Sequence, residues 1–103
     1  MGLVRHLSGD TVKALELYDD AIKSLSDVDA WRGISIFSRH KADLLRGTGD
    51  LKNARISLDR AVATAEAGFH PDLRHYCRVS DANLRRLEAR EDPTIRNLSL
   101  IHI

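Results

Sequence analysis

The sequence has few of the residues that mark disulfide-bonded, membrane-spanning or strongly charged proteins. Among 103 residues there is one cysteine, Cys77, so no internal disulfide can form, which fits a reducing compartment. No apolar run approaches the roughly 20 residues that span a bilayer, and the N-terminus lacks a signal-peptide core. The 16 basic and 15 acidic residues leave a net charge of +1, so no overall field indicates nucleic acid or a membrane surface. We therefore expect a cytoplasmic protein.

Proline and aromatic residues are also scarce, with two prolines and five aromatic side chains, and the alternation of β-branched residues that marks strands is absent. Apolar residues make up 43% of the chain, an ordinary value for a globular protein, and the length allows one domain. Apolar residues recur at three- and four-residue steps. The pattern predicts an all-α fold with helices over about 11–25, 28 or 29 to 46, 50–67 and 71–90.

Turn residues set the expected ends of these helices. Asp10 or Thr11 is the expected N-cap of the first helix. The glycines at 47 and 49 are expected to end the second helix and Gly68 the third, because glycine accepts left-handed backbone angles. Pro71 fits the first turn of the fourth helix, where its missing N–H does no harm.

Each expected helix has an apolar stripe that should be buried. Gly33 lies inside the second helix, where its small size would let another helix come close. The stripes comprise Ala14, Tyr18, Ala21, Ile22 and Leu25; then Trp31, Ile34, Phe37, Ala42 and Leu45; then Leu51, Ala54, Leu58, Ala61, Val62 and Ala65; and finally Leu73, Tyr76, Cys77, Ser80, Leu84 and Leu87.

One spacing occurs twice in the chain. Gly-Asp is followed by alanine five residues after the glycine, a large residue nine after and alanine twelve after; the copies are Gly9, Ala14, Tyr18 and Ala21, and Gly49, Ala54, Leu58 and Ala61. Small alanines let antiparallel helices approach closely, and the large residue fills the gap between them. The pattern resembles the second-helix half of a tetratricopeptide repeat.

The resemblance covers about residues 9–67 and implies antiparallel helix pairs stacked as a short right-handed solenoid. Ala42 and Leu45 fit the first-helix half of the family, whereas Ser38 and Lys41 depart from it. The two glycines are 40 residues apart, against about 34 in the standard repeat, which implies a longer second helix. An unrelated helical bundle is the alternative.

The resemblance divides the chain into a tetratricopeptide-like fragment over 1–92 and a tail over 93–103. Residues 98–103 match the in-frame translation of a common sequencing adapter, and a genuine apolar tail is the alternative interpretation. We expect an incomplete repeat array of marginal stability. Its apolar edges should be exposed near Leu3, Val4 and Leu7 and on the fourth helix.

Helical repeats of this kind mostly bind other proteins, so we expect an interaction scaffold that binds a peptide or partner helix in a concave groove. The first helix of each pair would line that groove with an arginine-rich wall, which suits an acidic peptide or a free C-terminus. The candidate peptide-binding residues are Arg32, Ser35, Arg39, Asp43, Arg74, Arg78 and Arg85. Two alternatives stay open: these are ordinary solvated faces, or the segment is a regulatory or sensory part of a larger bacterial signalling or transcription regulator.

Other function classes find little support in the sequence. His70, His75 and Cys77 are close in sequence but do not converge as zinc ligands must, so we expect no metal and no cofactor. Short basic clusters have no interleaved aromatic residues, so direct nucleic-acid binding is not expected. No nucleophile beside a base and no phosphate-binding loop is present, so we expect no enzyme activity.

Overall fold

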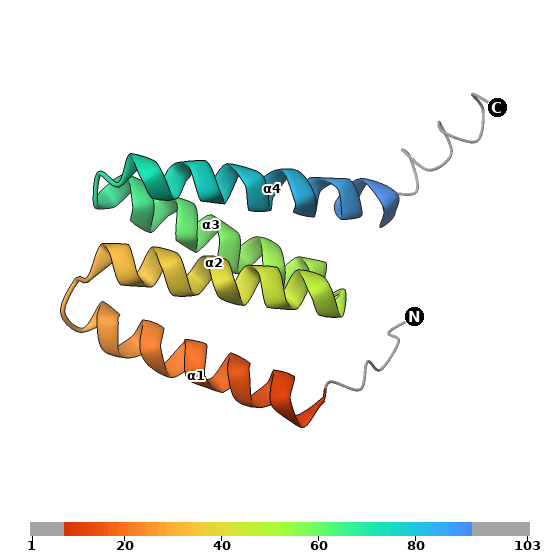
Figure 1. The fold of residues 1–103 in the computed structure, drawn as a ribbon, viewed down its shortest axis with the longest axis horizontal. Coiled ribbons are helices and arrows are strands. Elements are labelled where there is room, and N and C mark those ends of the chain that lie inside the picture. The colour runs from red at the N-terminus through yellow and green to blue at the C-terminus, as the bar shows by residue number, and fades with distance from the viewer. Residues whose placement is uncertain (1–7, 92–103) are drawn as a thin grey trace.

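The computed structural model describes residues 8–91, which form four helices joined by short turns (Figure 1). The helices are α1 (Gly9–Ser26), α2 (Trp31–Thr48), α3 (Leu51–Ala67) and α4 (Pro71–Glu91). Within these residues there is no strand, so the predicted all-α class is confirmed. The predicted helix ends agree with the observed ends to within a few residues.

The caps explain where the helices begin and end. Ser8, in extended backbone, caps α1: its Oγ accepts a hydrogen bond from the backbone N–H of Thr11 at 3.1 Å. The expectation that Asp10 or Thr11 is the N-cap is wrong, because both lie inside the helix. Gly49 has a φ of 86°, the left-handed conformation that was expected to end α2. Asp50 then caps α3 by accepting from the N–H of Asn53.

The α1–α2 and α3–α4 turns have the same backbone structure, displaced by 40 residues. Asp29 and Phe69 are the left-handed residues, with φ of 52° and 55°. In each turn the next residue donates its N–H to a carbonyl five residues earlier, Ala30 to Leu25 at 3.0 Å and His70 to Ala65 at 2.9 Å. The 40-residue period in the sequence is therefore also a period of the backbone.

Gly68 does lie at the end of α3, but its φ of −89° needs no glycine. Close approach explains the residue instead. A Cβ atom at this position would lie 2.9 Å from Cβ of Trp31 and 2.6 Å from Cδ2 of His70. Gly68 thus lets the α3–α4 turn pack against the start of α2.

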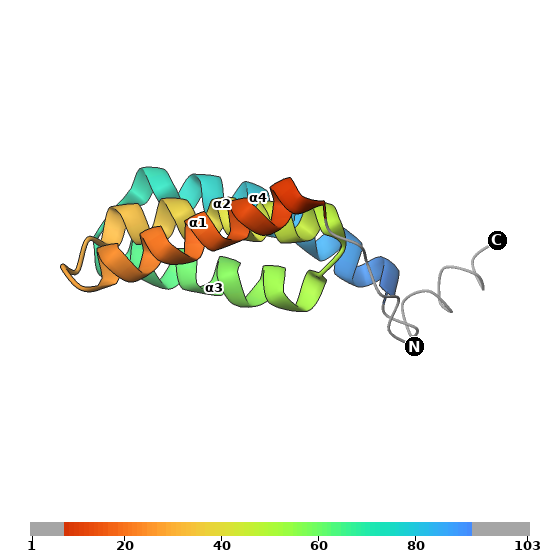
Figure 2. The same ribbon diagram turned by 90° about the horizontal axis from the view of Figure 1, so that it is seen from below.

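Helix α2 is the centre of the packing and contacts the other three helices, while α3 also contacts α4. Figure 2 shows α3 beneath the other helices, spanning the space below α2 and α4. The core forms where α2, α3 and α4 meet, and its buried residues are Ala42, Leu45, Leu51, Ala54, Leu58, Ala61, Cys77 and Leu84.

The four repeat alanines are buried to different degrees. Ala54 and Ala61 on α3 are 0% exposed, whereas Ala14 and Ala21 on α1 are only half-buried. The difference follows from position, because α3 packs between two helices and α1 packs on α2 alone among the described helices. Gly33 has the close contact that its size predicted, since a Cβ there would lie 2.8 Å from Cδ1 of Leu25.

Two residues of the predicted apolar stripes are wrongly assigned to the core. Trp31 is 39% exposed because it is the first residue of α2, at the edge of the packed region, where the Gly68 turn covers part of it. Tyr76 is 52% exposed because its ring lies on the flank of α4, under the Arg39 guanidinium. The predictions for Leu3, Val4, Leu7 and the 93–103 tail fall outside the described residues.

Candidate functional site

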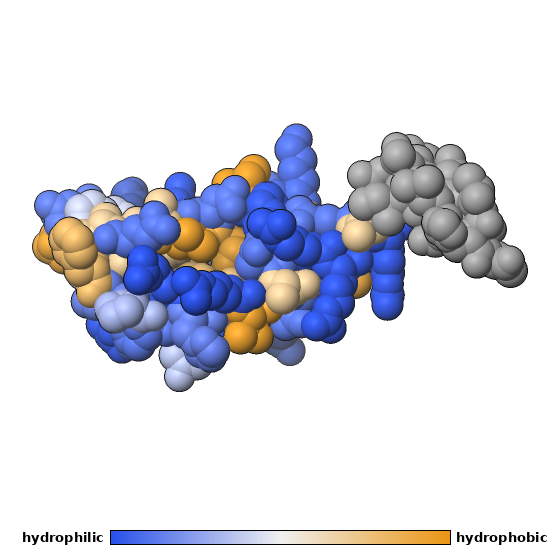
Figure 3. All heavy atoms as spheres, turned by 90° about the horizontal axis from the view of Figure 1, so that it is seen from above, coloured by the Kyte–Doolittle hydropathy of each residue, from blue (hydrophilic) through white to orange (hydrophobic). Residues whose placement is uncertain are grey.

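A groove runs along the line where α3 and α4 meet, and we call it the α3/α4 groove. It has a volume of about 300 Å³, and its lining residues are Arg55, Asp59, Val62, Glu66, Arg74, Cys77, Arg78, Asp81 and Arg85. Val62 and Cys77 are the apolar members, and the rest are charged. The face of the molecule on the α4 side is largely hydrophilic, with hydrophobic residues visible in a central hollow, at the end that carries the turns and in patches along both edges (Figure 3).

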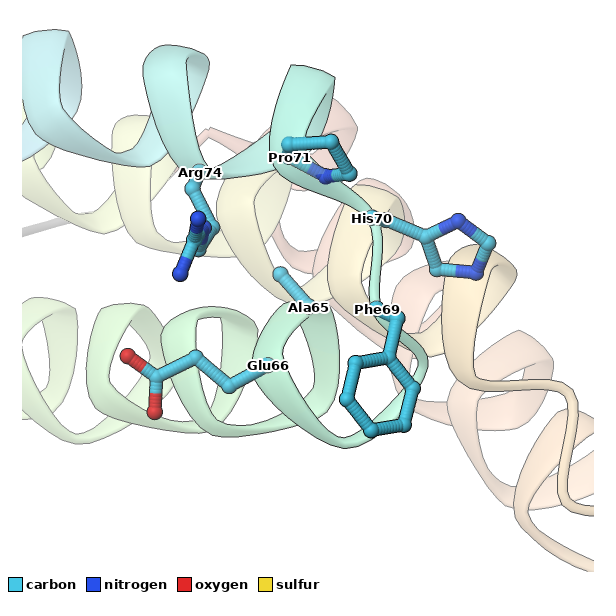
Figure 4. A pocket seen from close by; sticks show the side chains of 6 residues that line it. All are labelled: Ala65, Glu66, Phe69, His70, Pro71 and Arg74. Atoms are coloured by element: carbon cyan, nitrogen blue, oxygen red, sulfur yellow. The ribbon is translucent and has the colours of Figure 1, made fainter.

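A second hollow, of about 510 Å³, adjoins the groove at the α3–α4 turn. Its lining residues are Ala65, Glu66, Phe69, His70, Pro71 and Arg74. Glu66 and Arg74 line both hollows, so the two lie side by side. In Figure 4 the Arg74 side chain points from α4 toward the α3 side, while the His70 ring points away from it. Phe69, whose backbone is held in the turn, is 89% exposed.

In the structure the predicted peptide-binding residues do not share one surface, because those on α2 and those on α4 lie on opposite sides of α4. Arg32 pairs with Asp72 at 2.9 Å, and the Arg39 guanidinium lies 5.3 Å from the ring centre of Tyr76. Asp72 and Arg74 are two residues apart, which is about 200° around a helix. The α4 residues Arg74, Arg78 and Arg85 therefore face the α3/α4 groove, away from the α2 residues, and the single wall expected from the sequence does not form.

The predicted residues on α2 already interact with other residues of the chain. Asp43 lies 3.4 Å from Arg39 and 3.7 Å from Arg46. Ser35 is 1% exposed, and its hydroxyl donates to the backbone carbonyl of Ala61 at 2.7 Å. The prediction that Ser35 faces a ligand is wrong, because α2 turns this position into its contact with α3.

An ion-pair network joins α3 to α4 at the far end of the α3/α4 groove. The Arg55 guanidinium donates to both carboxylate oxygens of Glu88, at 2.6 and 3.2 Å, and to Oδ1 of Asp81 at 2.6 Å. Arg85 donates to the other oxygen of Asp81 at 2.7 Å. Burial alone would raise the pKa of Asp81, but the hydrogen bonds from Arg55 and Arg85 outweigh burial and lower it.

Arg74 and Arg78 differ from the other arginines of the predicted set, because neither has an ion-pair partner within residues 8–91. Both are exposed and line the groove above Val62 and Cys77. Guanidinium groups in this position are free to bind a carboxylate with two parallel hydrogen bonds.

The α3/α4 groove is the 40-residue counterpart of a hollow between α1, α2 and α3. That hollow is lined by Asp19, Ile22, Ser26, Trp31 and Ile34 from the first helix pair, together with other residues of that pair, and by Arg60 and Thr64 of α3. Forty residues later, the equivalents of the five are Asp59, Val62, Glu66, Pro71 and Arg74, all of which line the α3/α4 groove or its adjoining hollow. In the first copy α3 packs on α2 beside the hollow; in the second, no described helix occupies the corresponding place.

The residues considered for a metal site do not form one. Cys77 is 2% exposed, and burial raises the pKa of its thiol. His75 is exposed and stacks edge-on against Tyr76. Among the residues that the structure describes, no group of three or more His, Cys, Asp or Glu side chains is placed to hold a metal ion. None of the helices over 8–91 is both long and apolar enough to cross a bilayer.

Sequence reasoning missed the α3 side of the groove, especially Arg55, Val62 and Glu66. The 40-residue period locates part of the groove once the structure shows which residues line the first hollow. Adding 40 to the positions of Ile22, Ser26 and Ile34 gives Val62, Glu66 and Arg74. The signal for Arg55 was absent, because the equivalent residue on α1 is Leu15. Comparisons of the chain with protein-family models, with curated proteins and with solved structures found no match.

Proposed function

We propose that the chain is a protein-interaction module of the helical-repeat type, which binds a partner helix or peptide and carries out no reaction of its own. In this proposal α2 and α3 form one unit of a short tetratricopeptide-like solenoid, α1 is the second helix of the preceding unit and α4 is the first helix of the next. The matching turns at Asp29 and Phe69 support the repeat, and the 40-residue period of the sequence supports it independently.

One observation carries the proposal: the face of α4 that lines the α3/α4 groove is the 40-residue counterpart of the α2 face on which α3 packs. In the first copy α3 packs on α2, and the Ser35 hydroxyl donates a hydrogen bond to the backbone carbonyl of Ala61. A repeat unit buries its hydrophobic face by stacking on a neighbour. The second copy offers the same backbone geometry to another chain, and this mode of binding is that of a helix in a groove.

The test is a selection from a displayed library of 17-residue helix-forming peptides, the length of α3, against the full chain. We expect enriched peptides that lose binding when Glu66→Trp fills the junction between the two hollows. Glu16→Trp, a matched change at an exposed position of α1, should leave binding intact. Circular dichroism checks that both variants stay helical.

The proposal is contradicted if selection enriches no peptide over a scrambled library. It is equally contradicted if the enriched peptides bind the Glu66→Trp variant as tightly as they bind the unchanged chain.

A further inference from the structure

We propose that the occupant of the α3/α4 groove is a partner helix that carries acidic residues at positions i, i+7 and i+11 of the face it buries. This inference rests on the proposed interaction function and adds the chemistry of the partner. The acidic character of the partner is inferred by comparing residues of α2 with the residues 40 positions later on α4.

The α2 and α4 surfaces occupy equivalent positions 40 residues apart but differ in residue type and burial. On α2, the helix that packs on α3, Ile34, Ser38 and Leu45 are 2%, 0% and 5% exposed. The residues 40 positions later on α4 are Arg74, Arg78 and Arg85, and all three are exposed. A helix with the apolar stripe of α3 would bury these guanidinium groups without counter-charges, which is strongly unfavourable. The partner must therefore supply the anions.

The charges needed for such a partner are available. Arg74 and Arg78 have no ion-pair partner within the described part of the chain. Arg85 is held only by Asp81 of its own helix among the residues over 8–91, and its side chain is 73% exposed, so it can exchange that partner for another. Arginine paired to a carboxylate with two hydrogen bonds combines charge with a fixed geometry.

The spacing of the arginines sets the spacing on the partner. Arg74, Arg78 and Arg85 lie on one face of α4, at steps of four and seven residues. With a rise of about 1.5 Å per residue, the steps span about 6 and 10 Å. A helix antiparallel to α4, as α3 is to α2, matches them in reverse order with acids at i, i+7 and i+11. Small or apolar residues between the acids would cover Val62 and Cys77.

The chain itself is a poor source of this helix. Residues 92–103 contain one acidic residue, Asp92, and one arginine, Arg96, so their charge does not complement the groove. The i, i+7, i+11 acidic pattern occurs once in the sequence, at Asp81, Glu88 and Asp92. Asp81 and Glu88 are already paired with Arg55, which disfavours a second copy as the occupant.

The test uses a stapled 17-residue helix with glutamate at i, i+7 and i+11, and a matched peptide with glutamine at those positions. We expect the full chain to bind the glutamate peptide at least about tenfold more tightly, with an affinity that falls as salt rises. Arg74→Glu combined with Arg78→Glu should abolish that preference and allow binding of a lysine version of the peptide. Arg86→Glu, on an exposed part of α4 outside the groove lining, should change neither.

Several outcomes overturn the inference. Equal binding of the glutamate and glutamine peptides, or no binding of either, shows that the partner is not acidic. If the library selection meanwhile yields groove-dependent peptides of another composition, the interaction function stands and only the partner chemistry is wrong. A dimer in sedimentation equilibrium that the double arginine variant dissociates would identify a second copy as occupant. Binding that appears only after Leu100→Ser with Ile101→Ser would identify the tail.

Discussion

Two buried serines on α2 differ in whether their hydroxyl group has a hydrogen-bond partner. Ser35 and Ser38 are both almost fully buried, at 1% and 0% exposure. The Ser35 hydroxyl donates to the carbonyl of Ala61, whereas Oγ of Ser38 has no partner within residues 8–91. An unsatisfied buried hydroxyl destabilises a fold, while a satisfied one contributes modestly.

We therefore predict opposite effects for two otherwise identical substitutions. Ser35→Ala should lower the free energy of unfolding by about 1 kcal/mol, because the Ala61 carbonyl loses its donor. Ser38→Ala should leave stability unchanged or raise it, because it removes a group without a partner in the described part of the chain. Urea unfolding followed by circular dichroism measures both. A Ser38→Ala variant less stable than Ser35→Ala would contradict the assignment.

Two glycines give a second comparison. Gly47 lies inside α2, and a methyl group introduced there would have no neighbouring atom within 4 Å among the described residues, whereas one at Gly68 would meet Cβ of Trp31 at 2.9 Å. Gly47→Ala should raise the free energy of unfolding by about 0.5–1 kcal/mol through helix propensity. Gly68→Ala should lower it by about 1–3 kcal/mol, because the turn must move away from α2. If the midpoint temperatures of thermal unfolding of the two variants shift in the same direction, this explanation of Gly68 is contradicted.

At the scale of the helices, the sequence predicts where each helix lies in the chain better than it predicts which neighbour each side of a helix faces. The helices and the full burial of Ala54 and Ala61 follow from the three- and four-residue period, which depends only on helix geometry. The side on which Arg74 and Arg78 lie depends instead on how α4 crosses α2 and α3, and a single-helix pattern does not contain that information. The predicted wall failed for this reason, and Ser35 was misplaced because serine is usually exposed.

Ion pairs of Arg55 with Asp81 and Glu88 join α3 to α4. Arg55 and Arg85 lower the pKa of Asp81 below its usual range. A carboxyl group with a lowered pKa binds fewer protons in the folded state than in the unfolded state. Its contribution to stability is therefore complete above the unfolded pKa of about 4, and it is lost as the pH falls through the lower folded value.

The lowered pKa of Asp81 predicts a pH dependence of stability that one substitution weakens. The free energy of unfolding of the unchanged chain should fall as the pH drops below the unfolded carboxyl pKa of about 4. In Asp81→Asn the fall should be smaller, because the titrating group at Arg55 is gone. Asp20→Asn, an exposed carboxylate without an ion-pair partner in the described residues, serves as the control and should keep the full slope. Identical slopes in all three proteins would show that Asp81 does not stabilise the contact.

At the scale of the whole molecule, residues 8–91 contain two helix surfaces 40 residues apart, on α2 and α4, and only the α2 surface is covered by a described helix, α3. The first pair of helices packs α3 through small and apolar residues of α2, and the second pair presents arginines in the same positions. The two α4 arginines without ion-pair partners over 8–91, Arg74 and Arg78, make this face suited to the acidic partner proposed above.

The most direct test of this account is to map where a library-selected helical peptide binds, using NMR chemical shifts of the isotope-labelled full chain. We predict that the largest shift changes fall on both sides of the α3/α4 groove, at Val62 and Glu66 on α3 and at Arg74 and Arg78 on α4. Changes centred instead on the opposite flank of α4, around Tyr76, would contradict the claim that the second copy of the helix-packing site is the binding surface.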